Sequence, residues 1–318
     1  MDPITRAALS SWDWRPEVII VLALAGTFYI TGWWRLRQRT FARTQRQSER
    51  RQRQTRSQWH LAARWRLVSY VSGLLIIALS LLSPIDALAS QLFFMHMIQH
   101  LLLIMIAPPL LLIANPMPFM LWGLPTTLRQ RVGGAISRLL HRDSAFRRGL
   151  RAATTPGVIW LFWVISVIGW HDPTAYDLAL RYNVVHDIEH LFFFAAGMLY
   201  WWHITGAGPR IHKQIGLLGR IIFVLAAIPP NMALGVVLAF APQPVYTYYL
   251  AVPRLWNISV VDDQRIGGVI MWVPGSMMYI LAILLLAGRY FGNEEKKPAL
   301  TEKNWADESS LAAPGIKR

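Results

Sequence analysis

The sequence predicts an all-α, polytopic membrane protein: a bundle of seven transmembrane helices with the N-terminus outside and the C-terminus inside. Composition and hydropathy support this fold class. Hydrophobic residues make up 54% of the 318 residues and charged residues only 15%, whereas a soluble protein carries about 25% charged residues. The mean hydropathy is +0.33. The chain therefore has too little polar surface to cover a water-facing globule.

The membrane domain is expected over residues 17–290, after a short external N-terminus (1–16) and before a disordered cytoplasmic tail (291–318). Roughly 20 apolar residues are needed for a helix to cross the hydrocarbon core. Residues 1–16 lack a small-residue cleavage site, so we expect the first apolar stretch to be retained as a helix. The expected spans are 17–34, 67–84, 92–114, 157–171, 184–204, 217–240 and 267–288.

Basic residues in the connecting loops predict the orientation. The segment 35–66 holds eleven arginines and one acidic residue, and the segment 115–156 holds seven arginines. The loop 85–91 has no basic residue, and the loop 172–183 has one. Because cytoplasmic loops carry the excess of Lys and Arg, every second loop is expected inside. This pattern explains most of the net charge of +15, and it favours membrane lipid over nucleic acid as the partner of the basic segments.

Prolines recur inside the expected spans, at Pro108 and Pro109, at Pro229 and Pro230, and at Pro274. Each proline lacks a backbone donor and leaves a carbonyl that lipid cannot satisfy. We therefore expect a kink at each of these places, with the freed carbonyl bonded to a neighbouring helix or facing a polar site.

Two of the expected spans carry histidine pairs with the same spacing. The third span contains His96 and His100, and the fifth contains His186 and His190. Residues four apart lie one above the other on a helix face, and this spacing lets two imidazoles reach one metal ion. At a rise of 1.5 Å per residue, both pairs lie at similar depth below the outer surface. The four histidines are therefore the predicted ligands of a metal ion or haem.

The chain has no cysteine, which excludes disulfides, thiolate metal sites and cysteine nucleophiles. Other polar residues are candidates for additional or orienting contacts. Asp187 and Glu189 flank the second histidine pair, and either carboxylate could accept the second N–H of an imidazole. Met97 lies beside the first pair and favours a softer ion such as Cu(I) over calcium or magnesium. Three more candidates end or precede spans on the same outer side: His171, Asp262 and Asp263.

Four segments resemble the motifs of the CtaG-like cytochrome c oxidase assembly factors. They are 96–103 (HMIQHLLL), 107–111 (APPLL), 186–191 (HDIEHL) and 263–275 (DQRIGGVIMWVPG), and the resemblance extends over roughly residues 65–290. It implies a bacterial inner-membrane protein that helps to mature an aa-type haem–copper oxidase, with oxidase subunits as partners and copper as the metal handled. The expected function is thus to hold or deliver copper at the histidine cluster.

Three alternatives remain open. The run from His186 to His190 matches the His-x-x-Glu-His pattern of a zinc peptidase class, with His171 or Asp263 as a third ligand, so the protein could be a metal-dependent membrane hydrolase. A b-type haem protein is also possible, with the axial ligands split between helices, because haem ligands come from opposite faces of the ring. A copper transporter would share every feature of the assembly factor. The sequence shows no series of histidines or acidic residues along the spans toward the cytoplasmic side, which a transport path would need.

Overall fold

The computed structural model describes residues 6–7, 10–44, 62–209, 211–212 and 214–294. The part of the chain it describes is helical and contains no strand. Most of the predicted tail 291–318 and residues 45–61 of the predicted basic loop lie outside the described residues. The helices are α2 (Pro16–Thr44), α4 (Arg64–Leu82), α5 (Pro84–Ala89), α6 (Phe93–Leu101), η1 (Leu102–Ile106), α7 (Ala107–Ile113), α8 (Pro116–Gly123), α9 (Thr126–Leu139), α10 (Ala145–Ala153), α11 (Pro156–Trp170), α12 (Pro173–Arg181), α13 (Asn183–Thr205), α14 (Leu217–Leu225), α15 (Ile228–Phe240), η2 (Thr247–Leu250) and α16 (Val260–Glu294).

The prediction of a membrane helix bundle is confirmed, and the prediction of seven spans is supported only in part. Five helices or continuous helix pairs are long and apolar enough to cross a membrane, or six if the bent pair α10–α11 forms one span. Helix α13 has 23 residues but is not among them, because its first half carries several ionisable side chains. Its role as a seventh span and the orientation of the bundle stay predictions.

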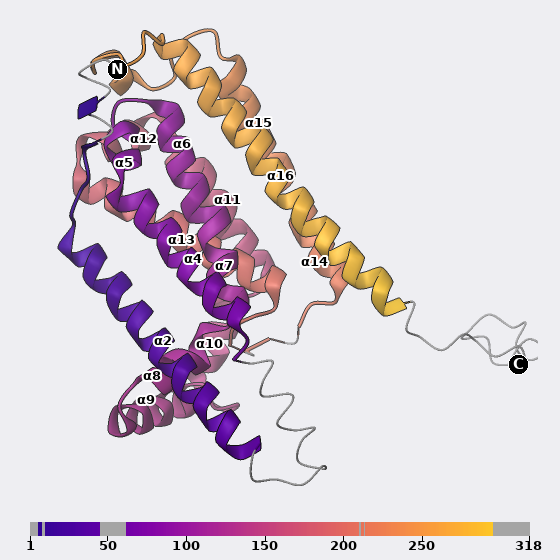
Figure 1. Ribbon diagram of the computed structural model, residues 1–318. Coiled ribbons are helices and arrows are strands. Elements are labelled where there is room, and N and C mark those ends of the chain that lie inside the picture. Colours follow the sequence, from indigo (N-terminus) through magenta and orange to yellow (C-terminus); the bar gives the residue numbers. More distant parts are fainter. Residues whose placement is uncertain (1–5, 8–9, 45–61, 210, 213, 295–318) are drawn as a thin grey trace, which may run out of the picture.

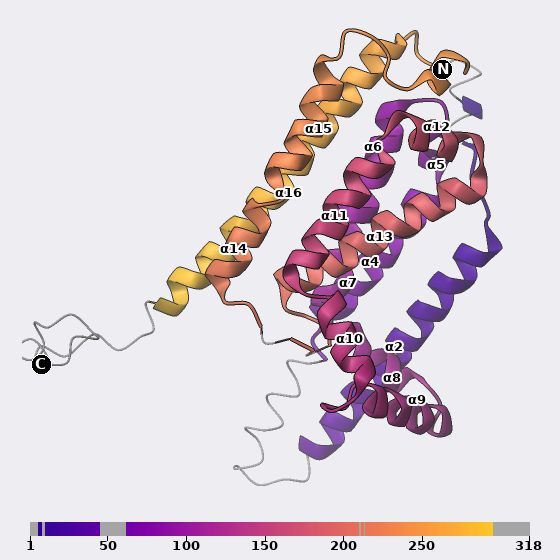
Figure 2. The ribbon, with the colours of Figure 1, turned by 180° about the vertical axis from the view of Figure 1, so that it is seen from behind.

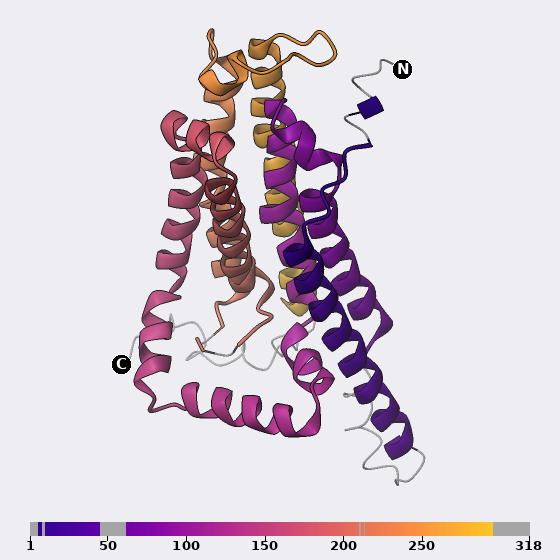
Figure 3. The same cartoon turned by 90° about the vertical axis from the view of Figure 1, so that its left-hand side faces the viewer.

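Two predicted boundaries differ from the structure. Helix α2 continues ten residues past the expected end of the first span, to Thr44, because the four arginines, the leucine, the glutamine and the alanine among these residues are good helix formers. The expected loop 115–156 contains the helices α8, α9 and α10. In Figure 3 helix α9 runs across one end of the bundle, with α8 and α10 at its two ends. The polar helices α9 and α10 have no buried residue and lie at the surface, whereas the apolar α8 packs against α2.

The loops predicted to be external gather at one end of the bundle. Figure 1 shows α5, α12 and the segment before α16 at the end opposite to α8, α9 and α10. Figure 2 shows α14, α15 and α16 as a long hairpin beside the remaining helices, and α16 packs along both partners. The alternation of loops read from the sequence thus agrees with the arrangement of the helices.

The third span departs from regular α-helix just before its prolines. Residues 102–106 form a π-helical turn, η1, between α6 and α7. The carbonyl of Ile104 has prolines four and five residues ahead, Pro108 and Pro109, so it cannot bond within its own helix. The indole Nε1 of Trp201 in α13 donates to this carbonyl at 3.0 Å. Gly197 allows the close approach, because a Cβ there would lie 2.7 Å from the same carbonyl oxygen.

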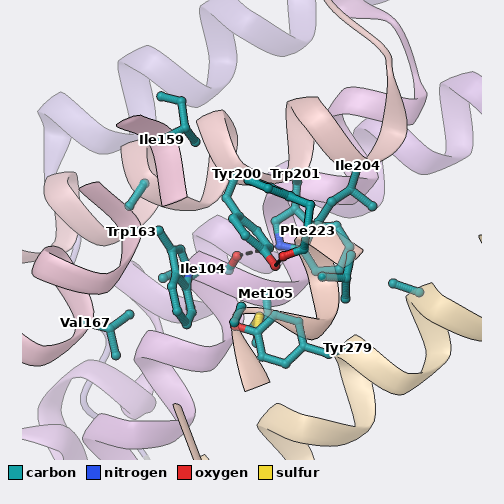
Figure 4. Close-up of a cluster of buried hydrophobic side chains, with 14 of the residues drawn as sticks. Ile104, Met105, Ile159, Trp163, Val167, Tyr200, Trp201, Ile204, Phe223 and Tyr279 are labelled. Atoms are coloured by element: carbon teal, nitrogen blue, oxygen red, sulfur yellow. Dashed lines mark hydrogen bonds between the residues drawn. The ribbon is translucent and has the colours of Figure 1, made fainter. Parts of the chain in front are cut away.

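The main hydrophobic core surrounds this junction. Figure 4 shows Trp163, Tyr200 and Tyr279 from three different helices around the carbonyl of Ile104 and its bond to Trp201. The rings of Trp163 and Tyr200 have centroids 5.4 Å apart, and those of Trp163 and Tyr279 are 6.0 Å apart. The span from Phe93 to Ile113 is the most buried of the candidate spans. The third span is therefore the centre of the bundle, with α13 held against it.

Candidate metal centre

The buried carboxylate of Asp263, in α16, fixes the start of α6. The first backbone amides of α6, those of Phe93 and Phe94, donate to the two Asp263 oxygens at 3.0 Å each. Leu92 at the helix cap has no polar side chain to do this, and the first amides of a helix otherwise lack partners. Arg254 donates to the same carboxylate at 2.8 Å. The α6 histidines are thus held on a helix that is anchored to α16.

The two histidines of α6 face one another in the interior. The Nε2 atoms of His96 and His100 lie 2.7 Å apart, and both residues are buried. Two nitrogens that each lie about 2 Å from one metal ion are separated by about 3 Å. The two Nε2 atoms are hydrogen-bonded to each other in this structure, and their spacing is close to that of two ligands of a single ion.

The second histidine pair faces the first from α13. The ring of His186 lies 5.2 Å from that of His96, and the ring of His190 lies 5.6 Å from that of His100, measured between centroids. His186 and His190 stack along their own helix with centroids 4.1 Å apart. The structure therefore brings together all four histidines that the sequence singled out, which required α6 and α13 to be neighbours.

Glu189 completes the cluster. Its carboxylate is fully buried and lies 3.5 Å from Nε2 of His100 and 3.8 Å from Nε2 of His96. Among the described residues, no lysine or arginine pairs with it. Two sets of possible ligands result, and each has its ligand atoms within 4.8 Å of one another: His96, His186 and His190 in one, and His96, His100 and Glu189 in the other. His96 belongs to both sets.

Many polar atoms of the cluster lack hydrogen bonds to the described residues. These atoms are Nδ1 of His96 and of His100, Nε2 of His186, both ring nitrogens of His190 and both oxygens of Glu189. Buried polar groups are paired in more than nine cases of ten, and an unpaired one costs free energy. A concentration of such atoms in one place is typical of a site that binds an ion.

His171 and Met97 lie at the edge of the cluster. Nε2 of His171 is 3.4 Å from the sulfur of Met97, and its Nδ1 donates to the carbonyl of Val167 at 2.6 Å. The His171 ring lies 5.9 Å from that of His100. The imidazole and the thioether thus lie side by side, in positions where both could bind one soft ion.

A polar network connects α6 with the residues before α2. Gln99 donates to Asp86 at 2.6 Å and to the carbonyl of Ser80 at 2.9 Å. Arg15 donates to Asp86 at 2.9 Å and to Asp187 at 2.7 Å. Burial raises the pKa of the Asp86 carboxyl, and the positive charge of Arg15 opposes that shift. This network ties the α6 face next to the histidines to the end of the bundle that carries α5 and α12.

Three candidate residues stand apart from the histidine nitrogens. Asp187 is more than half exposed and pairs with Arg15. Asp262 is exposed and bonds to Ser259 and to Arg265. Asp263 supports the cluster through the start of α6 rather than through an imidazole. Sequence position put these acids near the site, but the direction of each side chain depends on the neighbouring helices.

Two contributors could not be found from the sequence. The ring of Tyr176, in the short helix α12, lies 5.0 Å from that of His96, and its hydroxyl is 3.0 Å from the hydroxyl of Tyr249. Arg15 stands alone in a short polar segment. Neither Tyr176 nor Arg15 belongs to a motif or a residue spacing that would identify it as part of the site.

Comparison with known proteins identifies relatives of the chain. A family model described as cytochrome c oxidase caa3 assembly factor (Caa3_CtaG) matches residues 27–292. An uncharacterised protein of Mycobacterium bovis is 28% identical over 247 residues, and one of Mycobacterium leprae is 25% identical over 247 residues. Each match covers 76% of this chain, which spans only 36% of the length of these curated relatives. No solved structure matches the chain.

Proposed function

The chain belongs to the cytochrome c oxidase caa3 assembly factor family, and we propose that it holds copper at its histidine cluster and passes the ion to a subunit of an aa-type oxidase. The ligands in this proposal are His96, His100, His186 and His190, with the carboxylate of Glu189. The observation that carries the proposal is the convergence of these side chains from two helices, with unpaired nitrogens and oxygens, in the buried part of the bundle.

The donor atoms favour a transition metal over calcium or magnesium. Imidazole suits copper and zinc, whereas calcium and magnesium prefer oxygen ligands. The thioether of Met97, next to His171, adds a soft donor at the edge of the site. Soft ligands of this kind select Cu(I).

The charge of the cluster favours an ion of low charge. Glu189 is a buried carboxylate without a basic partner among the described residues. An uncompensated charge in an apolar interior is costly. One Cu(I) ion would balance one carboxylate, and neutral imidazoles would supply the remaining ligands.

The arrangement also suits transfer rather than permanent storage. Because His96 is shared by two overlapping ligand sets, an ion could exchange some ligands while keeping others. A site that delivers its ion has to release it, and shared ligands allow stepwise release. The oxidase subunit is the proposed acceptor, and the bacterial inner membrane is the proposed location.

The experiment compares metal content and Cu(I) affinity in four purified full-length proteins. They are the unchanged protein, His100→Ala, His190→Ala and the control His141→Ala, whose exposed histidine lies outside the cluster. We expect near-stoichiometric copper in the unchanged protein and the control, and a large loss in the two cluster variants. Oxidase copper loading in cells should fall in parallel. Equal loading by all four proteins would contradict the proposal.

The same measurement separates the alternatives. Zinc in place of copper, with hydrolysis of a peptide that disappears in the cluster variants, would favour the membrane hydrolase. A haem protein would show a Soret band.

A further inference from the structure

A second polar cavity lies at the other end of α13, about 20 Å along that helix from the candidate metal centre. It has a volume of about 30 Å³ and is formed where α13 ends and α14 begins. In Figure 2 this connection lies at the end of the bundle that carries α10. Its lining includes Trp202, His203, Gly206, Gly208, His212 and Arg220.

The charged side chains of this cavity are all cations or groups that can become cations. Arg220 is 9% exposed and uses Nε and Nη1 to bond the carbonyls of Ile215 and Ile204, at 3.0 and 3.2 Å. Its Nη2 makes no hydrogen bond to the described residues. Because Arg220 is anchored through two other nitrogens, its guanidinium has a fixed direction and a donor to spare.

Two histidines are held beside this guanidinium by one threonine. Nε2 of His203 donates to the Thr154 carbonyl at 3.0 Å, and Nε2 of His212 lies 2.7 Å from the Thr154 hydroxyl. The hydroxyl donates to Leu150, so His212 is the donor in that pair. The two imidazole centroids are 5.7 Å apart. The threonine thus fixes both rings at the cavity.

No carboxylate lines the cavity among the residues described. Further positive charge comes from Arg151. The pKa of the His212 imidazole is lowered mainly by burial and, to a smaller extent, by the charge of Arg151. Arg289 of α16 likewise repels Arg220. A buried arginine usually has an acidic partner. A positive cavity without one is complementary to an anion.

An apolar groove adjoins the positive cavity. The groove has a volume of about 340 Å³ and runs between α11 and α14, past Trp160, Gly219, Phe223 and Ala226. Ile215 lines both the groove and the cavity. A ligand that filled both would have an anionic head and an apolar chain attached to it.

We propose that this cavity and groove form a binding site for one anionic phospholipid. The headgroup phosphate would accept hydrogen bonds from Arg220 and from the histidines when these are protonated, and one acyl chain would lie in the groove. Arginine binds phosphate oxygens with charge-assisted bonds. Basic residues are expected on the cytoplasmic side, where anionic headgroups attract them. The site is independent of the metal centre and of the proposed function.

The test measures lipid binding to the full-length protein in detergent by native mass spectrometry, after removal of copurified lipid. The probes are phosphatidylglycerol, phosphatidylcholine and inorganic phosphate. Two variants change the site in different ways: Arg220→Gln removes the fixed charge, and Ala226→Trp fills the groove. The control Arg131→Gln removes an exposed charge from α9. His212→Ala is a milder change that leaves the Arg220 backbone bonds intact, should Arg220→Gln fail to fold.

We expect one phosphatidylglycerol per chain, bound roughly tenfold more tightly than phosphatidylcholine, since a charge-assisted phosphate contact is worth about that factor. Affinity should fall roughly tenfold in Arg220→Gln and in Ala226→Trp, less in His212→Ala, and not at all in the control. Equal binding of the two lipids, or equal binding by all variants, would overturn the proposal. Binding of inorganic phosphate that depends on Arg220, without preference between the lipids, would show a free-anion site and would also overturn it.

Discussion

Replacing Asp263 by alanine should destabilise the protein because Asp263 caps α6. The substitution removes the acceptor for the amides of Phe93 and Phe94, and it leaves Arg254 without its carboxylate. Hydrogen bonds to charged groups contribute about 1.5–3 kcal/mol each, and loss of a helix cap costs about 0.5–2 kcal/mol. Because these effects overlap, we expect a loss of about 3 kcal/mol in the free energy of unfolding.

The adjacent Asp262 provides a matched control. Its carboxylate is exposed and bonds only to residues within one turn, so Asp262→Ala should cost less than about 0.5 kcal/mol. Thermal unfolding in detergent, followed by circular dichroism, would measure both variants. A loss of about 3 kcal/mol corresponds to a melting temperature lower by roughly 5 °C for a domain of about 270 residues, at about 2.1 cal/mol/K of unfolding entropy per residue. Equal melting temperatures for the two variants would refute the assignment of Asp263 as the cap of α6.

Three further predictions test the packing and the charge of the cluster. Gly197→Val should prevent α13 from approaching the carbonyl of Ile104, and the yield of folded protein in size-exclusion chromatography should therefore fall. The control Gly149→Ala has open space around the new methyl group and should leave that yield unchanged. Trp201→Phe removes the only hydrogen-bond donor to that carbonyl among the described residues and should cost about 1–3 kcal/mol of stability by thermal unfolding; an unchanged melting temperature would contradict this. Glu189→Gln removes the carboxylate of the cluster, so the Cu(I) affinity measured by chelator competition should fall at least about tenfold, while the free energy of unfolding stays the same or rises. An unchanged affinity would exclude the carboxylate as a ligand.

The contrast between Glu189 and Asp187 shows how the cluster is built. Both acids flank the same histidines of α13, and from the sequence either could have supported an imidazole. In the structure Glu189 faces α6 and Asp187 faces Arg15. One face of α13 therefore belongs to the histidine cluster and the other to the polar network of Arg15 and Asp86.

The sequence alone determined the features that depend on local periodicity. Apolar length predicted the helices, and the resemblance of segments 96–103 and 186–191 to the assembly factors is confirmed by the family match over residues 27–292. The spacing of four residues put each histidine pair on one helix face, because that geometry depends only on the helix itself. At Pro108 and Pro109 the sequence predicted a kink, since a missing amide is a local property, and the structure has a π-helical turn just before these prolines.

Only the tertiary structure decided which helices meet. The position of α13 against α6 brought the two histidine pairs together, selected Glu189 over Asp187 and placed Tyr176 beside His96. Asp263 looked like a candidate ligand in the sequence and proved to be the cap of a helix 170 residues away. The physical reason is that contacts between helices depend on the packing of the whole bundle, whereas the pattern along one segment specifies only the faces that the segment can offer.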